Sequence, residues 1–151
     1  MAKHLKAADL RLPQGPVDLT AIDSGSTAGF KGGKTEGKGA LMALGDDLSD
    51  LQERLFAEGV ADVGHARSLL LVLQGMDTSG KGGVLKHTVG LVDPQGVTIT
   101  SFKAPTEEER ANDFLWRIRK ALPTRGRIGV FDRSHYAVSY THLTLPTNRE
   151  V

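Results

Sequence analysis

Three short apolar runs mark the predicted strands of this chain. Residues 69–73 form an unbroken aliphatic run, Val97 and Ile99 alternate with polar residues ahead of Phe102, and residues 128–131 form a third run. Runs of this length predict strands rather than buried helices. Because residues 69–73 are apolar throughout, we expect a central strand that is covered on both faces, as in a parallel sheet.

A leucine repeat ahead of the first strand predicts an amphipathic helix over residues 40–58. The leucines recur at alternating steps of three and four, which places them on one helical face. They are Leu41, Leu44, Leu48, Leu51 and Leu55. Gly59 follows at the position expected for a C-cap glycine. One apolar face needs a partner, so we expect this helix to pack on the sheet or on another subunit.

Two further helices are predicted between the strands. After Gly80, the spacing of Val84, Leu85, Val89 and Val92 gives one helical face. Thr106 and Glu109 form a capping box that predicts a helix over residues 107–122. Its inner face would hold Phe114, Leu115, Ile118 and Leu122. Its basic residues Arg117, Arg119 and Lys120 are interpreted as a solvated flank, with a basic anion site as the alternative. The alternation of strand and helix predicts two right-handed crossovers and an α/β fold.

The stretch QGMDTSGKGG directly after the first strand predicts a phosphate-binding loop. Gly75, Gly80 and Lys81 have the spacing G-x-x-x-x-G-K, in which backbone N–H groups and a lysine converge on a phosphate. Gly82 and Gly83 follow, so the Ser or Thr that usually binds Mg²⁺ is missing. Asp77 is then the candidate metal ligand, because Mg²⁺ prefers carboxylate and phosphate oxygens. A glycine-rich turn without a ligand is the alternative.

The third strand ends on Asp132 and Arg133, and the second leads into Lys103. A hydrophobic strand that ends in Asp, after a phosphate-binding loop in the same sheet, delivers a carboxylate to Mg²⁺. The carboxyl ends of parallel strands carry the ligand groups of open α/β sheets. We therefore expect Asp77, Lys81, Lys103, Asp132 and Arg133 on one rim. A structural ion pair of Asp132 with Arg133 is the alternative for those two residues.

Composition and charge restrict the expected partners and compartment of the protein and leave the predicted fold unchanged. The chain has 151 residues, 39% of them apolar, a net charge of +1 and no cysteine. These values fit one domain and predict neither a nucleic-acid nor a membrane partner. The lack of cysteine and of a membrane-length apolar run favours the cytoplasm. The five histidines show no metal-ligand spacing.

The two ends of the chain differ from its middle. Residues 1–39 mix Lys, Gly and Pro without apolar period, which predicts a flexible arm. Residues 40–136 would form the core, and residues 137–151 would form a tail that does not continue an α/β domain.

With these residues in view, the sequence resembles the polyphosphate kinase 2 family of P-loop kinases, which move phosphate between inorganic polyphosphate and nucleotides. The phrases that carry the resemblance are QGMDTSGKGG (74–83), DPQGVTITSFKAPTEEE (93–109), DFLWRIRKALP (113–123) and GVFDRSHY (129–136). The resemblance implies a three-layer P-loop kinase-like fold with a parallel sheet, incomplete at the C-terminus because the family's lid is not recognisable after Tyr136.

The resemblance also implies roles for individual residues. Asp77 and Asp132 would hold Mg²⁺ and supply the catalytic carboxylate, Lys81 and Arg133 would bind phosphates, and Lys103 would contact the anionic substrates. The substrates would be polyphosphate and a nucleoside mono- or diphosphate, and a homo-oligomer is implied by family analogy. An ATP-dependent nucleoside monophosphate kinase and a non-catalytic nucleotide-binding fragment are the alternatives.

Overall fold

A computed structural model of the chain describes residues 7–23, 25–62, 64–75 and 78–134. The chain divides into two units, Met1–Leu44 and Gly45–Val151. The first unit holds the 3₁₀ helices η1 (Ala7–Leu10) and η2 (Leu19–Ala21) and the helix α1 (Lys34–Ala43). Asp18 caps η2 by accepting hydrogen bonds from the hydroxyl and the backbone N–H of Thr20, which lower the pKa of Asp18.

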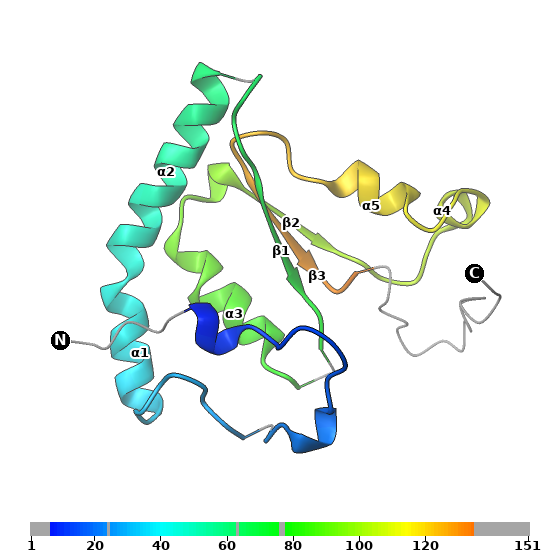
Figure 1. The fold of residues 1–151 in the computed structure, drawn as a ribbon. Coiled ribbons are helices and arrows are strands. Elements are labelled where there is room, and N and C mark those ends of the chain that lie inside the picture. Colours follow the sequence, from blue (N-terminus) through cyan, green and yellow to red (C-terminus); the bar gives the residue numbers. More distant parts are fainter. Residues whose placement is uncertain (1–6, 24, 63, 76–77, 135–151) are drawn as a thin grey trace. The chain divides into compact units, whose positions relative to one another are not determined.

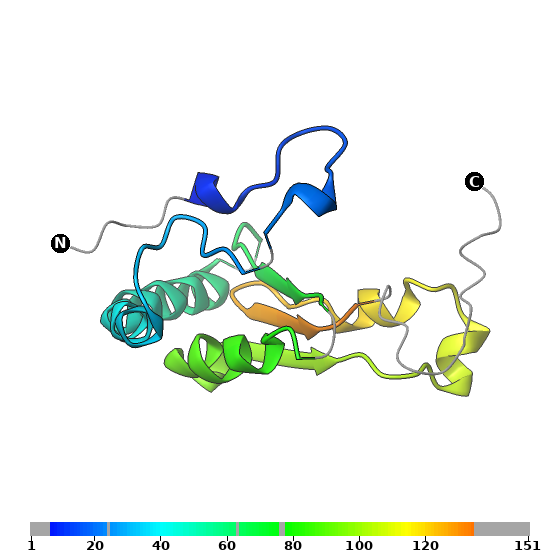
Figure 2. The same ribbon diagram turned by 90° about the horizontal axis from the view of Figure 1, so that it is seen from below.

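The second unit carries the sheet and the helices around it. Its helices are α2 (Gly45–Ala61), α3 (Lys81–His87), α4 (Glu107–Ala111) and α5 (Trp116–Ala121), with 3₁₀ turns η3 (Val89–Leu91) and η4 (Pro94–Gly96). Its strands are β1 (Leu69–Leu73), β2 (Val97–Ser101) and β3 (Ile128–Asp132). Figure 1 shows α2 and α3 on one side of the sheet and α4 and α5 on the other, and Figure 2 agrees. The predicted α/β fold with a parallel sheet is therefore confirmed.

The strand order is β1-β3-β2, so β3 is central and β1 lies at an edge. The prediction that residues 69–73 form a central strand covered on both faces is wrong. Leu69 is 55% exposed and Val72 is 44% exposed, whereas Val130 of β3 is fully buried. The reason is topological, because a uniformly apolar run identifies a strand but not the number of strands that pair with it.

The core of this unit is small and centres on β3. The Phe131 side chain is 1% exposed and meets the buried Phe102 ring edge to face, with ring centroids 4.9 Å apart. The Arg117 guanidinium lies over the outer side of the Phe102 ring, 5.3 Å from its centroid. Gly129 lets the Pro123 ring pack on β3, since a Cβ there would lie 2.8 Å from ring carbons. These contacts fix the segment after α5 against the central strand.

The leucine-repeat region forms two helices rather than the predicted helix over residues 40–58. One helix ends at Ala43, the next begins at Gly45, and the second continues past Gly59 to Ala61. Gly59 is therefore not a C-cap. A Cβ on Gly59 would lie 2.5 Å from the Cα of Gly126, so this glycine permits a close approach of two backbone segments.

The predicted helix over residues 107–122 is also interrupted. The capping box of Thr106 and Glu109 is confirmed, but α4 stops at Ala111. The Asn112 amide donates to the carbonyl of Glu108, and Asp113 Oδ1 accepts from the N–H of Leu115. Such local side-chain hydrogen bonds compete with the helix and end it.

Several side chains of this region also lie differently from the prediction. Phe114 and Leu122, expected on the inner face, are 64% and 48% exposed. The Arg117 side chain, expected on a solvated flank, is only 12% exposed. The break between α4 and α5 shifts the helical faces, so a single helical period no longer describes both parts. None of the helices in the described part of the chain combines the length and the apolar composition of a membrane-spanning segment.

Candidate functional site

The carboxyl ends of the three strands meet at one edge of the sheet. In the register of the sheet, Asp132 lies beside Leu73 of β1 on one flank and beside Ser101 of β2 on the other. The Ser101 hydroxyl donates to Oδ2 of Asp132 over 3.3 Å, and the backbone N–H of Phe102 donates to the carbonyl of Asp132. The Asp132 carboxylate is thereby held at the middle of this edge, in a half-buried position.

The glycine-rich loop begins two residues after Leu73, at the same edge. At Gly75 an added Cβ would lie 2.6 Å from the Ser79 hydroxyl, so a larger residue there would displace the Ser79 side chain. Gly80 has a φ of 93° and stands at the N-cap of α3, a conformation that side chains rarely adopt. Lys81 begins α3, and its Nζ donates to the carbonyl of Gly75 over 2.7 Å. The lysine ammonium therefore turns back over the loop.

Strained backbone conformations occur at the same edge of the sheet. Among the described residues, Thr78 and Arg133 are the non-glycine residues with positive φ, at 67° and 72°. Thr78 lies in the glycine-rich loop, and Arg133 directly follows Asp132. The N–H of Arg133 donates to the carbonyl of Leu73, which ties the end of β3 to the start of the loop. Strained residues that the surrounding structure holds in place are a recurrent feature of functional sites.

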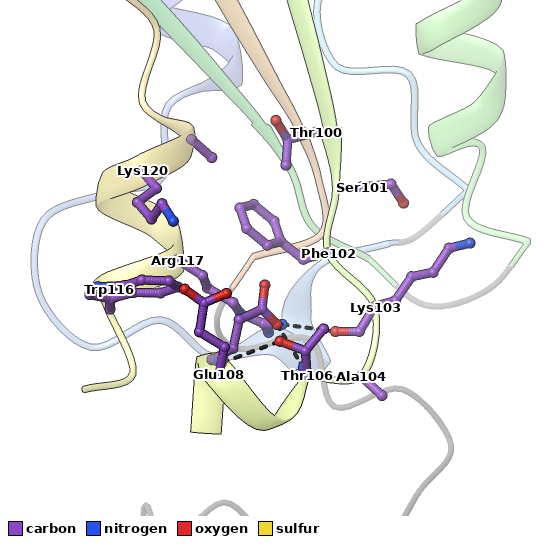
Figure 3. A pocket seen from close by; sticks show the side chains of 12 residues that line it. Thr100, Ser101, Phe102, Lys103, Ala104, Thr106, Glu108, Trp116, Arg117 and Lys120 are labelled. Carbon is purple, nitrogen blue, oxygen red and sulfur yellow. Dashed lines mark hydrogen bonds and ion pairs between the residues drawn. The ribbon is translucent and has the colours of Figure 1, made fainter. Parts of the chain in front are cut away.

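Successive side chains at the end of β2 point to opposite faces of the sheet. Ser101 and Lys103 point to the side where Ser101 contacts Asp132, and Phe102 points the other way, toward Arg117 (Figure 3). The Arg117 guanidinium donates to the carbonyl of Lys103 over 2.9 Å. This hydrogen bond fixes the backbone that carries Lys103.

The predicted rim residues stand at or after the carboxyl ends of the strands. Asp132 ends β3, Arg133 follows it directly, and Lys103 lies two residues after β2. Lys81 begins α3, after the loop that follows β1. The strands β1 and β2 both neighbour β3. Asp77, the predicted metal ligand and catalytic carboxylate, lies outside the described residues. Gly82 and Gly83 open the first turn of α3, and a Cβ on either one would meet no atom within 4 Å. Among the described residues, no cluster of three or more His, Asp or Glu side chains could hold a metal ion.

Sequence reasoning missed two hydroxyl groups at this edge. Ser101 was not distinguished, although its register partner Asp132 could have been inferred from aligning the ends of the two strands. Ser134 is buried, and its hydroxyl donates to Oε1 of Gln74 over 3.0 Å. That contact joins the residues after β1 and β3, and no local pattern in the sequence signals it.

These features define the class of the chain: an α/β protein with a parallel sheet whose carboxyl edge carries a carboxylate, cationic side chains and a glycine-rich loop. Residues 32–142 match the family described as Polyphosphate kinase 2. The chain belongs to this family.

The chain matches only part of the length of individual relatives. The chain is 41% identical, over 124 residues, to the AMP/ADP-polyphosphate phosphotransferase of Meiothermus ruber; the match covers 82% of the chain and 44% of that relative. It is 47% identical, over 89 residues, to the ADP-polyphosphate phosphotransferase of Rhodopseudomonas palustris, covering 59% of the chain and 29% of the relative.

A solved structure extends the likeness to the fold. The crystal structure of polyphosphate kinase 2 from Arthrobacter aurescens TC1 superposes with a TM-score of 0.77 at 54% sequence identity. The superposition covers 84% of this chain and 44% of that one. The chain therefore spans less than half the length of these relatives.

Proposed function

We propose that this chain carries the phosphate-transfer site of an enzyme that moves phosphate between inorganic polyphosphate and a nucleotide, AMP or ADP. The observation that carries the proposal is the register of the sheet, which aligns Leu73, Asp132 and Ser101 at one edge. That alignment supports a common site for the glycine-rich loop, the β3 carboxylate and the residues after β2. The names of the relatives, which are AMP/ADP- and ADP-polyphosphate phosphotransferases, support the substrate class.

In this proposal the glycine-rich loop is the phosphate-binding loop. Lys81 binds phosphate oxygens once a polyphosphate is present, in exchange for its hydrogen bond to the carbonyl of Gly75. Gly75, Gly80, Gly82 and Gly83 leave the loop backbone bare, so N–H groups can approach a phosphate closely. Arg133 and Lys103 place further positive charge at the same edge. Phosphoryl transfer depends mainly on alignment and on neutralising charge, and these residues supply both.

The proposed metal ligands are of the chemical type that Mg²⁺ prefers. A hard cation of this size takes one or two carboxylates together with phosphate oxygens and water. Asp132 provides one such carboxylate, and the hydroxyl of Ser101 is hydrogen-bonded to it. Asp77 is proposed as the second. When bound, Mg²⁺ would offset the negative charge of the donor and acceptor phosphates.

The transfer itself breaks the bond between the terminal phosphorus of polyphosphate and its bridging oxygen, and forms a bond from that phosphorus to a phosphate oxygen of the nucleotide. The shortened polyphosphate leaves with the bridging oxygen. Lys81 and Arg133 stabilise the charge on the transferring group, and Asp132 keeps the two phosphate groups in line.

The test is a transfer assay on the purified chain with polyphosphate, Mg²⁺ and AMP or ADP in parallel. Lys81→Ala and Asp132→Asn should each lower turnover by about 10²-fold or more, because each removes a group that neutralises or aligns charge in the transition state. Lys86→Ala on α3 and Asp50→Asn on α2 change exposed residues of the same types and should leave turnover unchanged.

Circular dichroism should show that both site variants keep the fold. Unchanged turnover in either one would reject the site assignment. Transfer from ATP but not from polyphosphate would instead identify a nucleoside monophosphate kinase. Melting that shifts with nucleotide in the absence of any turnover would identify a non-catalytic nucleotide-binding fragment.

Two further properties belong to the proposal. We place the enzyme in the cytoplasm, where nucleotide substrates are available. A homo-oligomer is proposed from the family resemblance, and it is supported by apolar side chains of α2 such as Leu51, which is 59% exposed. Light scattering on the purified chain would give the mass of the assembly directly.

A further inference from the structure

The ends of β1 and β3 lie side by side (Figure 1), and two hydrogen bonds join them beyond the last paired residues of the strands. Leu73 and Asp132 are the last pair in the register. The backbone N–H of Arg133 donates to the carbonyl of Leu73 over 3.0 Å. One residue further along each segment, the Ser134 hydroxyl donates to Oε1 of Gln74 over 3.0 Å. The second bond joins two side chains, so it depends on the residue types at these two positions.

The contact between Gln74 and Ser134 stands between two parts of the proposed transfer site. Gln74 directly precedes Gly75, whose carbonyl accepts the hydrogen bond of the Lys81 ammonium. Ser134 directly follows Arg133, the second cation proposed to stabilise the transferring group. A movement at this contact therefore shifts the start of the glycine-rich loop relative to Arg133.

The backbone conformation of Arg133 depends on support from its neighbours. Its φ is 72°, in the left-handed region that residues with a Cβ adopt only when the surrounding structure holds them there. The bond to Leu73 holds the N–H of Arg133, and the bond from Ser134 to Gln74 holds the residue that follows. Without the second bond, φ can relax toward negative values. That rotation about the N–Cα bond would turn the Cβ and point the guanidinium in another direction.

The exposure of the two partners separates a positioning role from a purely structural one. Ser134 is 7% exposed, whereas Gln74 lies at the surface. Because water can replace the hydroxyl at Oε1 of Gln74, loss of the contact should cost little folding free energy. The loss in rate should be larger, because a displacement of about 1 Å in a catalytic group can lower turnover by about 10²-fold.

We propose that Gln74 and Ser134 are positioning residues for phosphate transfer. Their hydrogen bond keeps Arg133 in its left-handed conformation and ties it to the start of the glycine-rich loop. The cations of both segments then meet the transferring phosphate in a fixed arrangement. This inference rests on the proposed transfer function. Neither residue needs to contact the phosphate, because each acts through Arg133.

A matched pair of substitutions isolates the hydroxyl. Ser134→Thr and Ser134→Val add nearly the same volume at a buried position, and only threonine keeps the hydroxyl. In the transfer assay, kcat should be about tenfold or more lower for Ser134→Val than for Ser134→Thr. The KM for polyphosphate should be similar in the two variants, because the contact aligns the transition state more than it binds the substrate.

Two more measurements test the partner and the mechanism. Gln74→Ala should lower kcat like Ser134→Ala, and the double variant should lose no more than either single variant, since both substitutions break one contact. Ser68→Ala changes an exposed serine before β1 and should match the wild type. Hydrogen exchange by NMR on the chain without substrate should show the Arg133 amide exchanging about tenfold faster in Ser134→Val than in Ser134→Thr, with equal rates at the buried Val130.

Four results would overturn the proposal. These are equal kcat in Ser134→Val and Ser134→Thr, additive losses in the double variant, equal exchange of the Arg133 amide in the Val and Thr variants, and an acceleration at Val130 as large as that at Arg133. The transfer function is read separately. A wild-type chain without turnover would reject that function, and the exchange rates would then decide whether Gln74 and Ser134 hold Arg133. Normal turnover with equal kcat in the two variants would do the reverse.

Discussion

Replacing Gly59 by alanine sets two physical effects against each other. Gly59 lies within α2, where alanine is intrinsically more favourable than glycine by up to about 1 kcal/mol. The added Cβ, however, would lie 2.5 Å from the Cα of Gly126 and 2.8 Å from the carbonyl oxygen of Arg125. Carbon atoms in contact prefer about 3.5–4.0 Å, so the two backbone segments would have to separate by about 1 Å.

The turn that faces Gly59 is anchored and resists this separation. The N–H of Gly126 donates to the carbonyl of Arg67 over 2.7 Å, and the Arg125 guanidinium donates to the carbonyl of the buried Ala66 over 3.1 Å. Overpacking at such a contact typically costs about 1–3 kcal/mol. After the gain in helix propensity is subtracted, Gly59→Ala should lower the free energy of unfolding by up to about 2 kcal/mol.

Urea unfolding followed by circular dichroism measures this difference. The midpoint should fall without a change in the slope with denaturant. In a thermal scan the same loss should lower Tm by up to about 16 °C, at about 4–8 °C per kcal/mol for a unit of this size. Gly83→Ala is the matched control, because its Cβ would meet no atom within 4 Å. A Gly59→Ala protein that melts higher than the wild type would refute the proposed close contact.

Two further substitutions test the core around Phe131 and the contacts of Arg117 with Glu109 and Phe102. Phe131→Ala, at 1% exposure in the central strand, should cost about 3–5 kcal/mol, whereas Phe114→Ala at 64% exposure should cost well under 1; equal losses in chemical denaturation would contradict the assigned core. Arg117→Leu should cost about 1–3 kcal/mol, because the Glu109 carboxylate loses its ion pair while it keeps the hydrogen bond from the N–H of Thr106. Arg117→Lys should restore only part of the loss, because lysine cannot reproduce the planar contact with Phe102. Full recovery by lysine in the same assay would show that only the charge matters.

The strand predictions succeeded because local patterns specify strands well. Residues 69–73, 97–101 and 128–132 form strands close to the expected positions, and the expected capping box is present at Thr106. The helix boundaries were less predictable. The leucine repeat and the segment 107–122 were each expected to be one helix, yet each is broken. The second break arises at Asn112 and Asp113, where side chains bond to the local backbone in place of the helix.

The residues proposed for catalysis were identifiable for a different reason. Lys81 and Asp132 stand next to local signals, a glycine spacing and the end of an apolar run, so the sequence marks them without reference to distant residues. The contact between Arg117 and Phe102 has no such signal. These residues are 15 positions apart in the sequence and meet only when the segment after β2 folds back on the strand.

The amino-acid sequence alone determined the α/β class, the approximate strands and the candidate charged residues, because these depend on short-range periodicity and spacing. The tertiary structure decided which strand is central. It also decided that Gly59 permits a close backbone approach to Gly126 and does not cap the helix, and that the Arg117 side chain is largely buried. Each of those outcomes depends on contacts between segments far apart in the chain. Local propensity carries no information about such contacts, since it is the same whichever segments become neighbours on folding.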